Sequence, residues 1–120
     1  WVKLGGEVLH QLGLQVAAVA ANDPFFGRAG RLLSMNQRES GTKTELAAPL
    51  YGNEPDTALA SINQHGDNFG RAFGIVSVDG QPAYTGCVGF GLERLVVAMF
   101  RVHGVSLDTW PDSVRSAVLP

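Results

Sequence analysis

The stretch TGCVGFGLERL (residues 85–95) is where the apolar pattern of the chain changes, and this change decides the fold. Up to Gly91 the pattern has the period of two typical of a strand, and beyond it the period becomes 3.6. The sequence therefore predicts a strand, a sharp turn at Gly89 and Gly91, and a helix that Gly104 ends. The apolar residues that share one face of this helix are expected to be core: Leu92, Leu95, Val96, Met99 and Phe100.

The start of that helix is a candidate anion site. Its first backbone N–H groups have no partner within the helix, and its dipole is positive at this end. Arg94 adds a planar guanidinium that can hold phosphate oxygens through two parallel hydrogen bonds. The spacing is neither the dinucleotide fingerprint nor a P-loop, because Arg94 replaces the third glycine and no Lys-Ser/Thr pair is present. On these residues alone, a packing turn with a surface Glu93–Arg94 pair is an equally good interpretation.

Further strands are predicted upstream of this junction. The segments with strand character are residues 14–21, 44–51, 57–63, 71–78 and 81–90. Asp79-Gly80 indicates a hairpin between the last two segments. The first segment is apolar and β-branched, so we expect it to be buried, and Pro49 favours an edge position or a bulge for the second.

The remaining segments predict helices. Trp1, Leu4, Val8 and Leu12 fall on one face of a helix that Gly13 ends. Residues 29–38 and 109–119 also have helical character, with Pro111 in the first turn of the last helix. Phe25 and Phe26 are expected to serve packing or a subunit interface. The predicted fold class is α+β, an antiparallel sheet backed by helices, in one domain over residues 1–120.

Composition excludes several classes of protein. The chain has 120 residues, of which 45% are hydrophobic and 17% charged, with a net charge of −2. The nine Lys and Arg are scattered, so no basic surface for duplex nucleic acid is expected. One cysteine excludes an internal disulfide and favours a reducing, cytoplasmic compartment. No apolar run approaches the roughly 20 residues that span a bilayer, so no membrane partner is expected.

Three blocks of the sequence carry a family resemblance. They are ANDPFFGRAGRLLSMNQRESGTKTEL (21–46), ASINQHGDNFG (60–70) and AYTGCVGFGLERLVVAMFRVHG (83–104). Together they resemble the amino acid:carrier protein ligases, class II enzymes similar to seryl-tRNA synthetases but without a tRNA-binding domain. Residues 86–100 resemble class II motif 3. Motifs 1 and 2 are not found in the chain. Because the chain starts at Trp1 inside a helical pattern, we expect it to be the C-terminal part of a longer catalytic domain.

The resemblance implies a reaction. ATP and a small amino acid, glycine or alanine, form an aminoacyl-adenylate, and the aminoacyl group then passes to the phosphopantetheine thiol of a carrier protein. The implied partners are that carrier protein and a second subunit in a homodimer, with no tRNA expected.

The resemblance also implies site residues. Arg94 matches the motif 3 arginine that holds the γ-phosphate of ATP, beside Gly91 and Glu93. Lys43 and Glu45, which alternate on a strand, form either a surface pair or a pair that orders ATP or Mg²⁺. Cys87 matches one ligand of a Zn²⁺ ion that grips the amino group of the substrate, although cysteines with a packing role are common. The implied amino-acid pocket contains Ser61, Asn63 and Asp67.

Several features depart from the family pattern and leave alternatives. Ile62, Gln64 and Asn68 stand where the family tends to have Cys, Tyr and His, which affects substrate choice. One cysteine cannot hold zinc alone, so the isolated 120 residues are expected neither to bind zinc tightly nor to adenylate amino acids. A non-catalytic binding or regulatory module and a seryl-tRNA synthetase fragment are the alternative functions.

The histidines have simpler interpretations. His65 is predicted in a polar loop with Asp67, where hydrogen bonding in the turn is favoured over a metal or acid–base role. His10 and His103 are expected to cap helix ends or lie at the surface.

Overall fold

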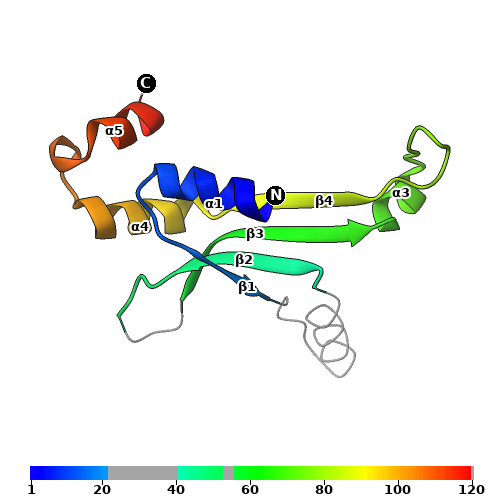
Figure 1. Cartoon of the computed structure of the whole chain (residues 1–120), viewed down its shortest axis with the longest axis horizontal. Coiled ribbons are helices and arrows are strands. Elements are labelled where there is room, and N and C mark those ends of the chain that lie inside the picture. The colour runs from blue at the N-terminus through cyan, green and yellow to red at the C-terminus, as the bar shows by residue number, and fades with distance from the viewer. Residues whose placement is uncertain (22–40, 53–55, 120) are drawn as a thin grey trace.

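A computed structural model describes residues 1–21, 41–52 and 56–119 of the chain. Four strands form one antiparallel sheet in the order β1-β2-β3-β4. The strands are β1 (Ala17–Ala20), β2 (Lys43–Ala48), β3 (Thr57–Gly66) and β4 (Thr85–Phe90). The helices are α1 (Val2–Gln11), α3 (Asn68–Phe73), α4 (Leu92–His103), the 3-10 turn η1 (Leu107–Thr109) and α5 (Asp112–Val118). Helices α1 and α4 lie beside the sheet (Figure 1), which confirms the predicted α+β class.

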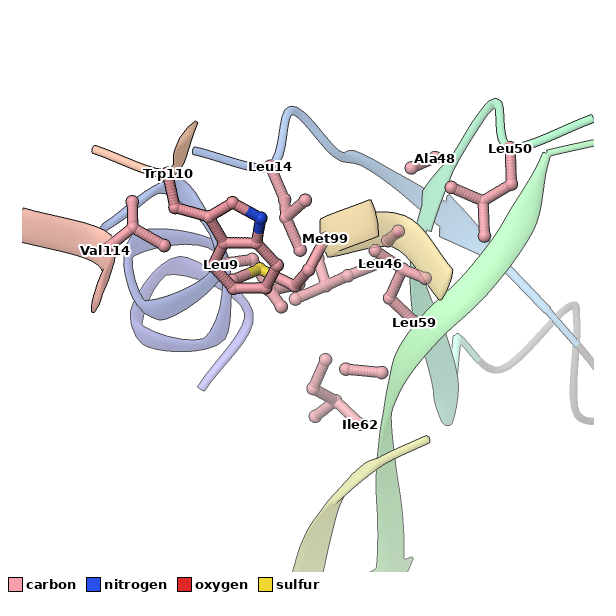
Figure 2. Close-up of a cluster of buried hydrophobic side chains, with 12 residues drawn as sticks. Leu9, Leu14, Leu46, Ala48, Leu50, Leu59, Ile62, Met99, Trp110 and Val114 are labelled. Carbon is pink, nitrogen blue, oxygen red and sulfur yellow. The ribbon is translucent and has the colours of Figure 1, made fainter. Parts of the chain in front are cut away.

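The core lies between the sheet and these helices (Figure 2). Strands β2 and β3 contribute buried aliphatic side chains, and helices α1, α4 and α5 add one or two each. The buried members include Leu9, Leu46, Leu59, Ala60, Ile62, Ala98, Met99, Trp110 and Val114. The predicted helix at 29–38 and the role of Phe25 and Phe26 lie outside the described residues.

Helix α1 buries a different face from the predicted one. Trp1 is 78% exposed, and Leu4 and Val8 are also exposed, whereas Gly5 and Leu9 are buried. A Cβ atom at Gly5 would lie 3.0 Å from Leu46 Cδ1, so the missing side chain lets the helix approach β2 closely. The predicted end of the helix is confirmed, since Gly13 has a φ of +76°.

Helix α4 departs from its predicted core face in the same way. Ala98 and Met99 are buried and Leu95 is partly buried. Leu92, Val96 and Phe100 are exposed within the described part of the chain, so the expectation that they are core was wrong there. Apolar periodicity defined the helix, but the small Ala98 decided which side of it comes close to the sheet.

The strands are shifted relative to their predicted positions. β1 is exposed along its length because it is an edge of the described sheet, so the expectation of a buried strand was wrong. β2 lies between β1 and β3 and ends before Pro49, so the edge position was also wrong. The register shifts between Leu46 and Ala47, where Leu59 of β3 has no partner in β2, which is a bulge.

The Asp79-Gly80 turn forms, but the strand predicted before it does not. Gly80 has a φ of +76° and its N–H donates to the Ser77 carbonyl at 2.9 Å. Only the single bridge Val76↔Pro82 joins the two sides, because residues up to Phe73 form α3 instead. The Ser77 hydroxyl and the Gln81 N–H donate to the Asp79 carboxylate and lower its pKa. This support for the turn is therefore lost as the pH falls through the lowered pKa.

The C-terminal segment packs back on the end of α1. His103 Nε2 lies 2.8 Å from the carbonyl oxygen of Leu12, the residue that follows α1, and Trp110 Nε1 donates to the Gly104 carbonyl at 2.8 Å. His103 thus has the expected capping role, at the end of α1, and Pro111 is the N-cap residue immediately before α5 instead of a residue of its first turn. Among the described residues, no helix has the length and apolar character that crossing a membrane requires.

Gly70 is the glycine whose replacement we expect to cost most. A Cβ atom there would meet the Ala83 backbone, with the nitrogen at 2.6 Å, and backbone cannot move aside easily. Gly70→Ala should lower the free energy of unfolding by about 1–3 kcal/mol in urea titrations of the polypeptide that carries this chain. Gly6→Ala is the matched control, since nothing lies within 4 Å of a Cβ there, and it should raise stability by up to about 1 kcal/mol. Equal effects of the two substitutions would contradict the packing of α3 against residue 83.

Candidate functional site

One face of the sheet is polar where strands β2, β3 and β4 lie side by side. The register aligns two rows of residues across these strands: Lys43, Asn63 and Cys87 in one, and Glu45, Ser61 and Gly89 in the next. Directly partnered residues share a face of the sheet, and neighbours along a strand alternate between faces. Ile62, between Ser61 and Asn63, lies in the core, so both rows occupy the opposite face.

A pocket of about 430 Å³ lies at the end of this face, where β4 passes into α4. Its lining joins residues from three strands and the first turn of the helix: Lys43, Glu45, Ala58, Leu59, Ala60, Ser61, Gly89, Phe90, Gly91 and Arg94. A Cβ atom at Gly89 would lie 3.7 Å from Ser61 Oγ, so the glycine leaves the space above Ser61 open. The structure therefore brings together five predicted site residues, namely Lys43, Glu45, Ser61, Gly91 and Arg94.

The strand–turn–helix geometry around Arg94 is as predicted, but the glycines contribute differently. Gly91 precedes the first turn of α4 with an extended backbone, φ −80° and ψ 94°, which any residue can adopt. Its N–H donates to the Leu59 carbonyl at 2.9 Å, which ties the start of the helix to the bulge in β3. The turn therefore does not require a left-handed glycine, and the small residues serve instead to leave room in the pocket.

The side chain of Arg94 is hydrogen-bonded to the backbone near the start of β3. Its Nη1 donates to the Ala58 carbonyl at 3.0 Å, while the side chain is exposed. A guanidinium carries five N–H donors, so one bond to a carbonyl can orient it while others are used for an anion. Glu93 is exposed in the first turn of α4 and is not among the residues that line the pocket.

The Lys43–Glu45 pair lies in the pocket rather than on the outer surface. Lys43 Nζ is 3.4 Å from Glu45 Oε1, and the two side chains are 10% and 28% exposed. Burial weakens the screening of both charges by water and makes their mutual contact stronger than that of an exposed pair. Of the two interpretations of this pair, the structure favours the one in which it faces the site.

A second cluster lies one row further along the polar face. Cys87 Sγ is 3.6 Å from His65 Nε2 and 3.7 Å from Asn63 Nδ2, and His65 Nδ1 is 3.4 Å from Thr85 Oγ1. The prediction that His65 sits in a loop was wrong, because β3 continues to Gly66. The signal that could have placed His65 is the alternation of Ser61, Asn63 and His65 along one strand.

Asp67 is not brought into the pocket. Its carboxylate accepts a hydrogen bond from Arg71 Nε at 2.7 Å. Asp67 is the N-cap residue of α3 and lies beyond the end of β3. The three predicted amino-acid pocket residues are thus spread along β3: Ser61 lines the pocket, Asn63 contacts Cys87, and Asp67 pairs with Arg71.

Cys87 is exposed, so it is not a buried packing residue. Among residues 1–21, 41–52 and 56–119, no three His, Cys, Asp or Glu side chains are grouped so that they could hold a metal ion. The thiol of Cys87 and the imidazole of His65 are nevertheless of the sulfur and nitrogen types that zinc prefers. Within the described residues the two side chains are chemically suited to zinc but do not by themselves form a metal site.

Comparisons with known proteins find relatives over nearly the whole chain. Over 115 residues the chain is 44% identical to amino acid–acyl-carrier-protein ligase 2 of Bradyrhizobium diazoefficiens, which covers 96% of this chain and 34% of that protein. Ligase 1 of the same organism is also 44% identical over 115 residues. The type-2 serine–tRNA ligase of Methanopyrus kandleri is 30% identical over 119 residues, covering 92% of this chain and 22% of that protein. No family model matches the chain.

A solved structure agrees with these relatives. The crystal structure of M. kandleri SerRS in complex with A. aeolicus tRNASec superposes with a TM-score of 0.68 at 26% identity, over 96% of this chain and 23% of that one. The fold described above is therefore that of a segment of a class II synthetase-type domain. The chain spans about a third of the length of the two ligases it matches.

The buried position of the Lys43–Glu45 pair has a measurable consequence. Glu45→Gln should lower the free energy of unfolding by about 1–3 kcal/mol, because it removes the carboxylate from a largely buried ammonium. The same change in the exposed pair Lys3–Glu7, 3.8 Å apart, should cost less than about 0.5 kcal/mol. Urea unfolding of Glu45→Gln and Glu7→Gln compares the two, and equal losses would show that the pocket pair is solvated.

Proposed function

We propose that this chain, a homologue of amino acid–acyl-carrier-protein ligases and of serine–tRNA ligases, is the C-terminal part of the catalytic domain of an ATP-dependent ligase. In this proposal the complete protein adenylates a small amino acid, glycine or alanine. It then transfers the aminoacyl group to the phosphopantetheine thiol of a carrier protein. The upstream polypeptide supplies motifs 1 and 2, the remaining zinc ligands and the homodimer contacts.

The observation that carries the proposal is the shared pocket at the β4–α4 junction. One exposed arginine, one largely buried lysine and one carboxylate line the same 430 Å³ space as the backbone of Gly89 and Gly91. A nucleoside triphosphate needs donors for its phosphates and a carboxylate for its metal ion, and this lining offers both. In this proposal the guanidinium of Arg94, beside the N-terminus of α4, donates to the γ-phosphate.

The chemistry of the first step asks mainly for positioning and charge neutralisation. A carboxylate oxygen of the amino acid attacks the α-phosphorus of ATP, a new P–O bond forms, and the bond to pyrophosphate breaks in line. Arg94 and Lys43 bear positive charge toward the triphosphate, and Glu45 supplies an oxygen ligand for Mg²⁺. In the second step the phosphopantetheine thiolate attacks the acyl carbon, a thioester forms, and AMP leaves.

In this proposal the polar row beyond the pocket, with Asn63 and Cys87, binds the amino acid. Ser61 in the lining and Asn63 beside it provide a hydroxyl and an amide for a small polar substrate. In this proposal Cys87 would supply one sulfur ligand to Zn²⁺, and the bound zinc would hold the amino group of the substrate. In this proposal Asp67 supports the pocket without contacting the substrate, because its carboxylate pairs with Arg71 in the structure.

Pyrophosphate exchange by the complete protein tests the ligase. With zinc present, glycine or alanine should drive exchange of labelled pyrophosphate into ATP, and serine should drive it far less. A predominance of serine would favour the seryl-tRNA synthetase alternative, to which the 30% identity with a type-2 serine–tRNA ligase points. If none of the three amino acids drove exchange, the non-catalytic binding or regulatory module would be the remaining alternative. The isolated 120 residues should show no exchange in any case.

Arg94 provides the residue-level test. Arg94→Ala in the complete protein should lower kcat/KM for ATP about 100-fold, as expected when one donor to a reacting phosphate group is lost. Arg115→Ala is the matched control, because Arg115 pairs with Asp112 on α5 and does not line the pocket. If both variants kept the parent kinetics, Arg94 would have no part in ATP binding.

A further inference from the structure

We infer that Gly89 is a specificity-determining residue of the pocket, because the side chain that it lacks leaves room for the amino acid above the hydroxyl of Ser61. The inference rests on the proposed function, in that the pocket is taken to hold the substrates of the adenylation step. It deepens that function by naming the position that limits the size of the amino acid accepted there.

Nothing in the backbone requires a glycine at position 89. Gly89 lies within β4 and is not among the glycines with a positive φ, so any residue can adopt its conformation. A Cβ atom there would lie 3.7 Å from Ser61 Oγ, which is ordinary van der Waals contact. At Gly86, in the same strand, a Cβ atom would lie 2.9 Å from the carbonyl oxygen of Asn63, so there the backbone itself excludes a side chain. Since a glycine within a strand lowers stability relative to alanine, Gly89 is better explained by the space that it leaves than by the fold.

That space borders the uncharged part of the pocket. Strand pairing places Glu45, Ser61 and Gly89 in one row, and all three line the pocket. Glu45 pairs with Lys43 at one end of the row, whereas a residue without a side chain stands at the other. The charged groups suit the phosphates and Mg²⁺, so the end with Ser61 and Gly89 is left for the amino acid.

The hydroxyl of Ser61 is available to a ligand in this space. Its oxygen lies 3.4 Å from Asn63 Nδ2, and within the part of the chain that the structure describes the hydroxyl donates to no other group. The carboxylate of an amino acid is an acceptor without a proton, so Ser61 can donate to it. In the proposed arrangement the amino group then points toward Asn63, and the substituent on the α-carbon lies against Gly89.

The opening between Ser61 and Gly89 limits how large that substituent can be. A methyl group added at position 89 would itself be in contact with Ser61 Oγ, so it would take the space of a substrate atom. One methyl group more or less in a binding pocket typically changes the discrimination between substrates by about 10–200-fold. The effect of a side chain at position 89 is therefore large enough to measure.

Pyrophosphate exchange by the complete protein tests the inference. In Gly89→Ala, the KM for whichever of glycine and alanine drives exchange should rise about 10-fold or more, and where both do, alanine should lose more than glycine. The KM for ATP should be unchanged, and the melting temperature should equal or exceed that of the parent. Gly6→Ala is the matched control and should keep the parent kinetics, because Gly6 does not line this pocket and nothing lies within 4 Å of a Cβ atom there.

The outcomes separate this inference from the proposed function. If neither glycine nor alanine drives exchange in the parent protein, the proposed function fails and the inference falls with it. If the parent is active and Gly89→Ala keeps its KM for the amino acid, the inference alone is overturned. A KM for ATP that rises as much as that for the amino acid, or more, would assign the space to the nucleotide and also overturn it. A lower melting temperature of Gly89→Ala would show that the fold requires the glycine, with the same result.

Discussion

The structure depends on the pairing of β3 with a strand on each of its edges. β2 pairs with one edge and β4 with the other, both antiparallel. Because side chains alternate along β3, this pairing assigns Ala60 and Ile62 to the core and Ser61 and Asn63 to the polar face. A slip of one residue in either pairing would exchange the two faces. The core and the candidate site are therefore specified by the same hydrogen bonds.

The irregularity in β3 connects that sheet to the helix that completes the pocket. Leu59 is the bulge residue, its side chain is fully buried, and its carbonyl accepts from Gly91 at the start of α4. The preceding carbonyl, of Ala58, accepts from Arg94. Two consecutive backbone oxygens thus hold the helix start and the arginine side chain. An arginine at a helix terminus would otherwise be positioned by a flexible side chain alone, whereas here a hydrogen bond to the sheet orients it.

The polar face combines two kinds of chemistry at adjacent positions. The row with Glu45 and Ser61 opens into the pocket, and the row with Asn63 and Cys87 carries the sulfur and lies beside the imidazole of His65. Neighbouring positions on one face of a strand are two residues apart, so the two groups of side chains lie next to each other. Several apolar residues of α1 and α4 are also exposed, including Leu4 and Leu92. Their exposure is compatible with a chain that spans about a third of its relatives' length.

The sequence by itself determined the change from strand to helix at Gly91, the ends of helices at Gly13 and Gly104, and the common side of Lys43 and Glu45. These features are local, because periodicity and turn chemistry act within a few residues. Only the tertiary structure decided which helix faces are buried. Small residues such as Gly5 and Ala98 lie against the sheet, and several larger apolar side chains of the predicted stripes, such as Leu92, are exposed. It also decided that His65 meets Cys87, since residues 22 apart become neighbours only when β3 and β4 pair. Contacts of that kind depend on strand register, which no single segment encodes.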